Sequence, residues 1–376
     1  MGRGRTALLV VVMLAAAACQ RTAGVAVAPA GSPSVTKPAS PTTSASGPST
    51  KLRLGALAAT SNTLWVLGTV GCTANKCPAH LYRSRDDGRR WQQLPLPPAV
   101  TMSSGDGTTP GVTNVAFATD DEGLLYGPAL WSTHDGGATW HRLRVAGAVT
   151  AVRFSATVTW AVSQSCASGQ ACRGRVLRAA TGTDQFRDAQ LPQPSGADGA
   201  PVSIATNGSV VGALVSGTPN TRHDADQLDL SIDDGRTWTH REGPCLNELG
   251  GSLAVSRSTV WSACPTGMQA AIAVLQNRDA FHEQRGPWQA LPNSAGVTVG
   301  AHSVLVTSAG SAWVSKDSGA SWSVARVITP AWQSLADISF PAASEGYALA
   351  VAPTTSWLVH TTDGGHTWKR LPPPTA

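Results

Sequence analysis

Apolar and polar residues alternate at period two in short runs along most of the chain. Each run is three to five residues long and is followed by polar or turn-forming residues, which predicts half-buried β-strands. Such runs recur at 63–67, 124–126, 158–162, 210–214, 259–261, 303–306 and 347–351. The pattern therefore predicts an all-β chain built from one recurring strand.

A second recurring feature is the eight-residue motif Ser/Thr-x-Asp-x-Gly-x-Ser/Thr-Trp. Short Ser, Thr or Asp side chains accept backbone N–H groups in a tight turn, and Gly supplies the positive φ that the turn needs. The motif thus predicts a hairpin turn whose Trp returns into the packing between neighbouring sheets. The copies lie at 84–91, 133–140, 231–238, 315–322 and 361–368, with Arg90 replacing the second hydroxyl residue in the first copy. Their Asp, Gly and Trp residues are Asp86, Gly88 and Trp91; Asp135, Gly137 and Trp140; Asp233, Gly235 and Trp238; Asp317, Gly319 and Trp322; and Asp363, Gly365 and Trp368.

These residues resemble the Asp-box, or BNR repeat, of sialidase-type β-propellers. The resemblance implies four-stranded antiparallel blades around a ring, with the motif between the third and fourth strands of a blade. A residue needed once per repeat is a requirement of the fold. We therefore expect the five motif aspartates to be structural and not catalytic.

The spacing of the motif predicts the number of blades. Successive motif aspartates are 49, 98, 84 and 46 residues apart, so each long gap holds two periods. Degenerate copies fit those gaps at 185–186, ahead of 191–192, and at 288–292, which echoes 91–95. Seven repeats between 51 and 376 give about 47 residues each, a length typical of propeller blades. The expected fold is a seven-bladed β-propeller, with six blades as the alternative.

Composition agrees with this fold and excludes some classes of function. The 38 Gly, 25 Pro and 14% charged residues disfavour long helices, and thirteen Trp against five Phe indicate periodic placement of Trp. The net charge of +5 includes Arg3 and Arg5, which lie in an expected leader, so the remaining chain is close to neutral. We therefore expect no nucleic-acid partner.

The N-terminus predicts export. Residues 1–18 contain two arginines and an apolar run from Ala7 to Ala18, which is typical of a signal peptide and too short to span a bilayer. The sequence 16–19, Ala-Ala-Ala-Cys, resembles the lipobox of bacterial lipoproteins, apart from Ala16 where Leu is commoner. The resemblance implies an acylated Cys19 that anchors the protein on the extracytoplasmic face of the cell membrane; an ordinary secretory signal cleaved near Ala18 is the alternative.

Residues 19–50 form a Pro/Ser/Thr-rich linker after the acylated cysteine. Their low apolar content predicts a disordered tether between the membrane and a propeller domain at 51–376.

The six remaining cysteines predict disulfides. An exported chain meets an oxidising compartment, and short loops close at the lowest entropic cost. We expect Cys72 to pair with Cys77, Cys166 with Cys172, and Cys245 with Cys264. Zinc is the weaker alternative because no couple has CxxC spacing, and we expect no metal and no cofactor. The Arg222–Asp226 stretch holds one His and two Asp residues that could bind a metal, but a solvated loop explains it better.

The blade scheme places function on one face. With the motif between the third and fourth strands, the longer connections gather on the opposite face, around 71–79, 97–111, 165–174, 217–227 and 242–251. Function in repeat proteins concentrates on the loop-bearing side. We expect this face to bind an envelope protein or a glycan, and non-enzymatic propellers such as the photosystem II assembly factor are similar in repeat pattern. The oligomeric state stays open.

The alternative function is that of a carbohydrate-active propeller, either a lectin or a sialidase-like glycosidase. Sialidases carry arginines that clamp the substrate carboxylate, an acidic residue and a Tyr–Glu pair. Arg53 and Arg153 are the candidate arginines. Tyr82 adjoins a motif, and Tyr126 and Tyr347 are predicted to lie in second-strand cores, with no evident Tyr–Glu pair. We therefore expect a non-catalytic binding platform.

Overall fold

The computed structural model describes residues 52–374 apart from 73–76, 99, 103–110, 166–172, 193–199, 217–224, 247–248, 257, 267, 277–279, 289, 293–294, 301–302 and 330–331. The signal peptide, Cys19 and the linker lie outside the described residues and stay predictions. The described residues contain strands and no helix, so none of their segments is a helix that could cross a membrane.

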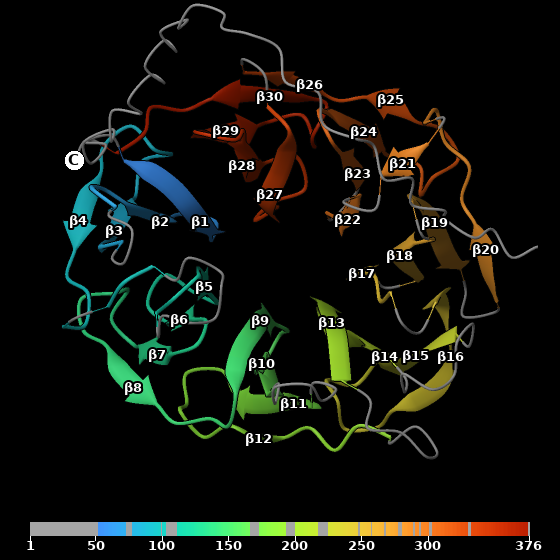
Figure 1. The fold of residues 1–376 in the computed structure, drawn as a ribbon, viewed down its shortest axis with the longest axis horizontal. Coiled ribbons are helices and arrows are strands. Elements are labelled where there is room, and N and C mark those ends of the chain that lie inside the picture. The colour runs from blue at the N-terminus through green and yellow to red at the C-terminus, as the bar shows by residue number, and fades with distance from the viewer. Residues whose placement is uncertain are drawn as a thin grey trace, which may run out of the picture. The chain divides into compact units, whose positions relative to one another are not determined.

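The strands form seven sheets arranged around a ring (Figure 1). Blades 1 and 2 comprise β1 (Arg53–Ala59), β2 (Leu64–Thr69), β3 (Ala79–Ser84) and β4 (Gln92–Leu94), then β5 (Asn114–Phe117), β6 (Gly123–Tyr126), β7 (Leu130–Thr133) and β8 (His141–Leu143). Blades 3 and 4 comprise β9 (Ala148–Phe154), β10 (Val158–Ser165), β11 (Arg173–Ala180) and β12 (Arg187–Asp188), then β13 (Ala200–Asn207), β14 (Val210–Ser216), β15 (Ala225–Ser231) and β16 (Thr239–Leu246).

The remaining strands complete three more blades. Blades 5 and 6 comprise β17 (Ser252–Val255), β18 (Thr259–Pro265), β19 (Gln269–Gln276), β20 (Phe281–Glu283) and β21 (Leu291–Pro292), then β22 (Gly296–Val299), β23 (Val304–Ser308), β24 (Ser311–Ser315) and β25 (Ser323–Val324). Blade 7 comprises β26 (Arg326–Ile328), β27 (Ser334–Ser339), β28 (Gly346–Val351), β29 (Ser356–Thr361) and β30 (Thr367–Arg370).

Each blade is an antiparallel meander whose first strand lines the centre of the ring and whose fourth strand lies outermost (Figure 1). Two strands depart from this scheme, because β21 adds to β19 and β26 pairs with β30 in parallel. The seven-bladed prediction is confirmed, and the six-bladed alternative is wrong. Blades 3 and 5, which lack a full motif, hold the predicted degenerate copies.

Blade 7 meets blade 1 by packing, since each sheet is built from a consecutive stretch of the chain. Leu57 and Val66 of blade 1 share a buried cluster with Tyr347 and Leu349 of blade 7. Side chains add polar links across this seam: Ser356 Oγ donates to the Leu54 carbonyl at 2.8 Å. The ring therefore closes through the same face-to-face packing that joins the other blades.

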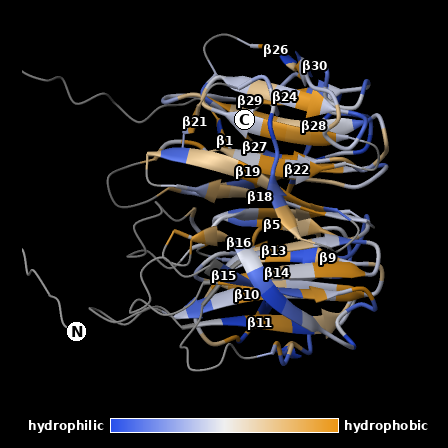
Figure 2. Ribbon diagram, turned by 90° about the vertical axis from the view of Figure 1, so that its right-hand side faces the viewer, coloured by the Kyte–Doolittle hydropathy of each residue, from blue (hydrophilic) through white to orange (hydrophobic). Residues whose placement is uncertain are grey.

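Tryptophans fill the spaces between blades. Trp65, Trp160 and Trp261 lie on the second strands of blades 1, 3 and 5 and are fully buried. Each lies beneath the motif turn of the next blade: Trp65 Nε1 donates to the Gly136 carbonyl at 3.2 Å, and a Cβ at Gly235 would lie 2.2 Å from the Trp160 ring. Figure 2 shows apolar residues gathered along the strands that stack through the ring. The abundance of Trp thus follows from the packing between blades.

Candidate functional site

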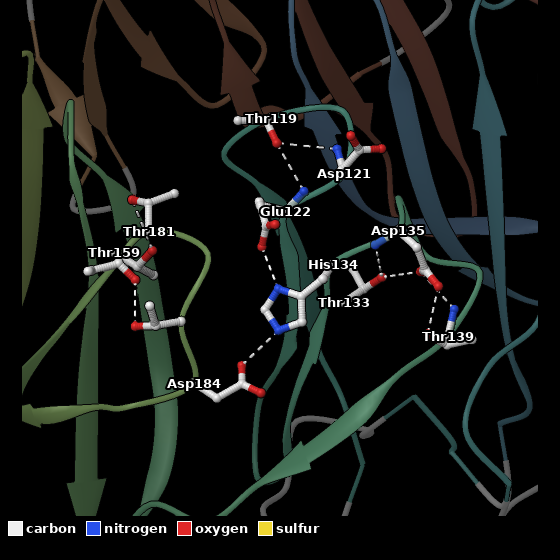
Figure 3. A network of polar contacts seen from close by, with 12 residues as sticks. Thr119, Asp121, Glu122, Thr133, His134, Asp135, Thr139, Thr159, Thr181 and Asp184 are labelled. Carbon is white, nitrogen blue, oxygen red and sulfur yellow. Dashed lines mark hydrogen bonds and ion pairs between the residues drawn. The ribbon is translucent and has the colours of Figure 1, made fainter.

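The five motif turns share one hydrogen-bond pattern, which Figure 3 shows for blade 2. Thr133 Oγ1 donates to Asp135 Oδ1 at 2.8 Å and accepts the N–H of Gly137 at 2.9 Å. The same Asp135 oxygen accepts the N–H of Thr139 at 2.8 Å, while Oδ2 accepts the Thr139 hydroxyl at 2.6 Å. The aspartate therefore ties the two ends of the turn between the third and fourth strands together.

The first copy uses a guanidinium in place of the hydroxyl. Arg90 Nε donates to Asp86 Oδ2 at 2.7 Å, where Thr139 and Thr237 use a side-chain oxygen at 2.6 Å. The Arg90 backbone N–H still bonds Asp86 Oδ1 at 2.8 Å. The turn thus keeps its shape but carries an additional positive charge.

Electrostatics agree with a structural role for these carboxylates. Hydrogen bonds from the Ser321 side chain and backbone hold the pKa of Asp317 at about 2. Bonds from Arg90 lower the pKa of Asp86 to about 2 in the same way. Each motif aspartate bonds within the turn of its own blade, so the fold distributes these groups around the ring and does not bring them together.

The innermost strands enclose a central channel of about 560 Å³. Its walls are mostly small or aliphatic side chains from all seven blades, among them Ala58, Ala116, Ala205 and Val297. Arg153 of β9 and Asp337 of β27 are the charged residues among the described lining residues. The channel is therefore lined by small side chains but exposes more polar than apolar surface, with one cation and one carboxyl group among its described lining residues.

Asp337 lies at a bulge where the register of β27 against β28 shifts. Its φ of 48° is in the left-handed region, and Oδ2 accepts the N–H of Leu57 at 3.1 Å across the seam between blades 7 and 1. Burial raises the pKa of Asp337 to about 6, partly offset by that hydrogen bond and by the charge of Arg153. Asp337 therefore accepts a hydrogen bond from the Leu57 backbone N–H at the channel wall, where blade 7 meets blade 1.

Arg153 and Tyr126 lie together on the channel wall between blades 2 and 3. Arg153 donates to the Val152 carbonyl at 2.8 Å, and its side chain also bonds Tyr126. Tyr126 is buried, as predicted for a second-strand core residue, and its burial raises the pKa of its phenol. Arg53, the other candidate arginine, is not among the channel-lining residues that the structure describes.

The expectation that no tyrosine stands in a Tyr–Glu pair is wrong. Tyr347 donates to Glu345 Oε1 at 2.8 Å, and its ring stacks on His360 at 4.6 Å. Glu345 directly precedes β28 and stands two residues before Tyr347, and such neighbours lie on the same face of an extended chain, so strand alternation was the signal for this pair. Burial raises the pKa of Tyr347 far above its ordinary value, whereas a nucleophilic phenolate needs a lowered pKa. The described channel lining also holds one carboxyl group, while a glycosidase needs two.

The opposite ends of the strands carry the longer connections and two disulfides. Cys72 pairs with Cys77 inside the β2–β3 loop. Cys245 pairs with Cys264 and joins blade 4 to blade 5. These two pairings are confirmed, and the couple Cys166–Cys172 lies outside the described residues.

Asp226 is a buried carboxyl group that the sequence analysis placed in a solvated loop. It lies on β15 with no accessible surface, and neither carboxyl oxygen has a hydrogen-bond partner among the described residues. Burial raises its pKa to about 7. Arg222, His223 and Asp224 lie outside the described residues, and the described residues contain no group of three side chains that could hold a metal.

A polar network joins blades 2 and 3 on the motif face (Figure 3). His134 bonds Glu122 at 2.6 Å and Asp184 of blade 3 at 3.3 Å. The bond to Glu122 raises the pKa of His134. The two acids come from different turns, so sequence spacing gave no signal for this contact.

These features define a seven-bladed β-propeller with a narrow central channel and two unlike faces. No protein-family model matches the sequence, and no curated protein is significantly similar to it. Among solved structures, a YCF48 bound to a D1 peptide shares 16% identity over 84% of this chain and 91% of that chain, with a TM-score of 0.52. YCF48 from Cyanidioschyzon merolae shares 14% identity over 69% and 84% of the two chains, with a TM-score of 0.46.

A third similar structure is a puromycin-hydrolysing peptidase from Mycobacterium tuberculosis. It shares 13% identity with a TM-score of 0.58, and the match covers 90% of this chain and 56% of the peptidase. At these identities the likeness is one of fold.

Proposed function

We propose that this protein is an exported, lipid-anchored propeller that binds a protein partner through its loop-bearing face and carries out no chemistry itself. The observation that carries the proposal is the division between the two faces. Motif carboxylates on one face are engaged in their own turns, whereas the other face holds the longer connections, and disulfides lie at two of them. Rigid loops on a stable scaffold lower the entropic cost of binding.

The structural neighbours support the same class of function. A propeller of similar fold, YCF48, holds a D1 peptide, which shows that this architecture can present a peptide-binding surface. We do not propose a hydrolase activity from the likeness to the peptidase. The match covers 56% of the peptidase, and this sequence contains no Gly-x-Ser-x-Gly nucleophile motif. A glycan-binding role is not favoured by any observed group in the channel.

Site-specific photocrosslinking tests which face meets the partner. Met268 and Leu249 lie in loop-face connections and are 93% and 41% exposed, whereas Ile232 lies in a motif turn and is 47% exposed. A photoreactive residue at 268 or 249 should give one discrete adduct in intact cells, and the same residue at 232 should give none. Adducts from position 232 alone, or from no position, would contradict the proposal.

The proposed anchor is tested separately. Cys19→Ala should move the protein from the membrane fraction to the soluble fraction, because a thioether-linked lipid can no longer form. Mass spectrometry of the native N-terminus should show the acyl chains, and an unmodified Cys19 thiol would disprove the anchor without affecting the proposed binding face.

A further inference from the structure

A groove on the outer side of blade 1 is separate from the central channel and from the loop-bearing face. It encloses about 310 Å³ and is lined by Arg83, Arg85, Asp86, Arg90, Trp91 and Gln92. Three guanidinium groups therefore meet a single carboxylate. This size lies at the lower end of the range for small-molecule sites.

The three arginines differ in how many of their donors are occupied. Arg83 donates to the Gly136 carbonyl at 3.2 Å and to Gln92 Oε1 at 3.0 Å, which fixes it at the back of the groove. Arg90 uses Nε on Asp86, and its side chain is 90% exposed, so its two terminal nitrogens face solvent. Arg85 is exposed and makes no hydrogen bond or ion pair with the described residues.

Two like charges, those of Arg83 and Arg85, therefore lie close together at this groove. Burial and the nearby charge of Arg85 lower the pKa of Arg83, while the charges of Asp121, Asp135 and Asp120 act in the opposite direction. Asp86 bonds Arg90 and not Arg85: its oxygens accept from Ser84, the Arg90 backbone and the Arg90 side chain. An anion between Arg85 and Arg90 would compensate the charge of Arg85 and accept from the unused donors of both side chains.

We infer that this groove binds a phosphate monoester of a small molecule. Among the described lining residues three guanidinium groups accompany one carboxylate, and the oxygens of a phosphate dianion can accept from guanidinium groups on several sides. The groove has more room than the phosphate needs, and Trp91 offers an apolar wall for the organic part of the ligand. Blade 1 differs from the other blades with a full motif at this position, because Arg90 stands where the other four motifs have Ser or Thr. The inference does not rest on the proposed partner-binding role.

Titration calorimetry of the full chain at low ionic strength tests the site. The probes are inorganic phosphate, glycerol 3-phosphate and succinate, which separate free phosphate, a phosphate ester and a dicarboxylate. Arg90→Thr is the sharpest variant, because Thr is the residue that blades 2, 4 and 7 use to hold the same turn. It should leave the thermal unfolding temperature almost unchanged and weaken glycerol 3-phosphate binding about tenfold or more.

Arg85→Gln should weaken binding to a similar extent. Lys316→Gln is its matched control, since Lys316 occupies the same motif position in blade 6 and its removal changes the net charge equally. Retained binding in the Lys316 variant, together with loss in both arginine variants, supports the site. Equal effects of all three variants, or succinate binding as tightly as glycerol 3-phosphate, would overturn it.

Discussion

Two constraints limit which residue can stand at many positions of this protein. One is the backbone geometry of the turns, and the other is the side chain of the neighbouring blade that packs against the position. Gly235 shows both demands: its φ is 72°, and the Trp160 ring fills the space that a side chain would need. A side chain there would carry backbone strain and a clash with a buried indole.

Gly235→Ala should therefore cost more than backbone strain alone. Gly208 is the matched control, because its φ of 59° is also positive and nothing lies within 4 Å of an added Cβ. Gly208→Ala should cost about 1 kcal/mol and Gly235→Ala at least about 3 kcal/mol in denaturant unfolding. Equal costs would show that Trp160 yields to the added methyl group.

Asp226 gives a residue-scale prediction about pH. Its folded-state pKa of about 7 lies above that of an unfolded Asp, so the folded protein binds the proton more tightly. The free energy of unfolding should therefore fall as pH rises from about 4 to 7 and level off above pH 7. Asp226→Asn should gain about 4 kcal/mol at pH 8 and almost nothing at pH 4. Urea unfolding at both pH values measures this, and a pH-independent gain would contradict it.

Strands and loops show how blades are joined. Cys245–Cys264 spans 19 residues and ties two blades, whereas Cys72–Cys77 closes a separation of five residues inside one loop. The entropy lost by the unfolded chain grows with the length of the closed loop.

Removing the two disulfides should therefore have unequal effects. The double variant Cys245→Ala/Cys264→Ala should lose about 3 kcal/mol, and Cys72→Ala/Cys77→Ala about 2 kcal/mol. Chemical denaturation under non-reducing conditions compares them. A larger loss from the short loop would indicate that loop contacts and not chain entropy dominate.

The whole molecule depends on closing a ring without exchanging a strand between its ends. Leu349 at the seam between blades 7 and 1 is 1% exposed, and Leu81, in the cluster between blades 1 and 2, is fully buried. Similar burial at the two places predicts that the seam is as stable as the contact between blades 1 and 2.

Leu349→Ala and Leu81→Ala should accordingly cost similar amounts, about 2 to 5 kcal/mol each. Both variants should unfold in a single transition when followed by Trp fluorescence and by circular dichroism. A much smaller cost for Leu349→Ala, or a separate early transition, would show that the seam opens before the rest of the ring.

The sequence by itself determined the blade count, the turn positions and two disulfide pairings. These features depend on residues that are close together in the sequence. A turn needs a hydroxyl, an aspartate and a glycine at fixed offsets, and a short loop brings Cys72 near Cys77. Strand alternation likewise placed Tyr126 and Tyr347 in second-strand cores.

Only the tertiary structure decided which groups share an environment. Asp337 meets Leu57 across the ring closure, His134 meets Asp184 from another blade, and Asp226 is buried on β15. The arginines of blade 1 are neighbours in sequence, but whether they enclose a groove depends on the pleat and twist of their strands. Contacts between separate blades depend on how each sheet is rotated against the next. The spacing of residues within one blade does not predict that rotation.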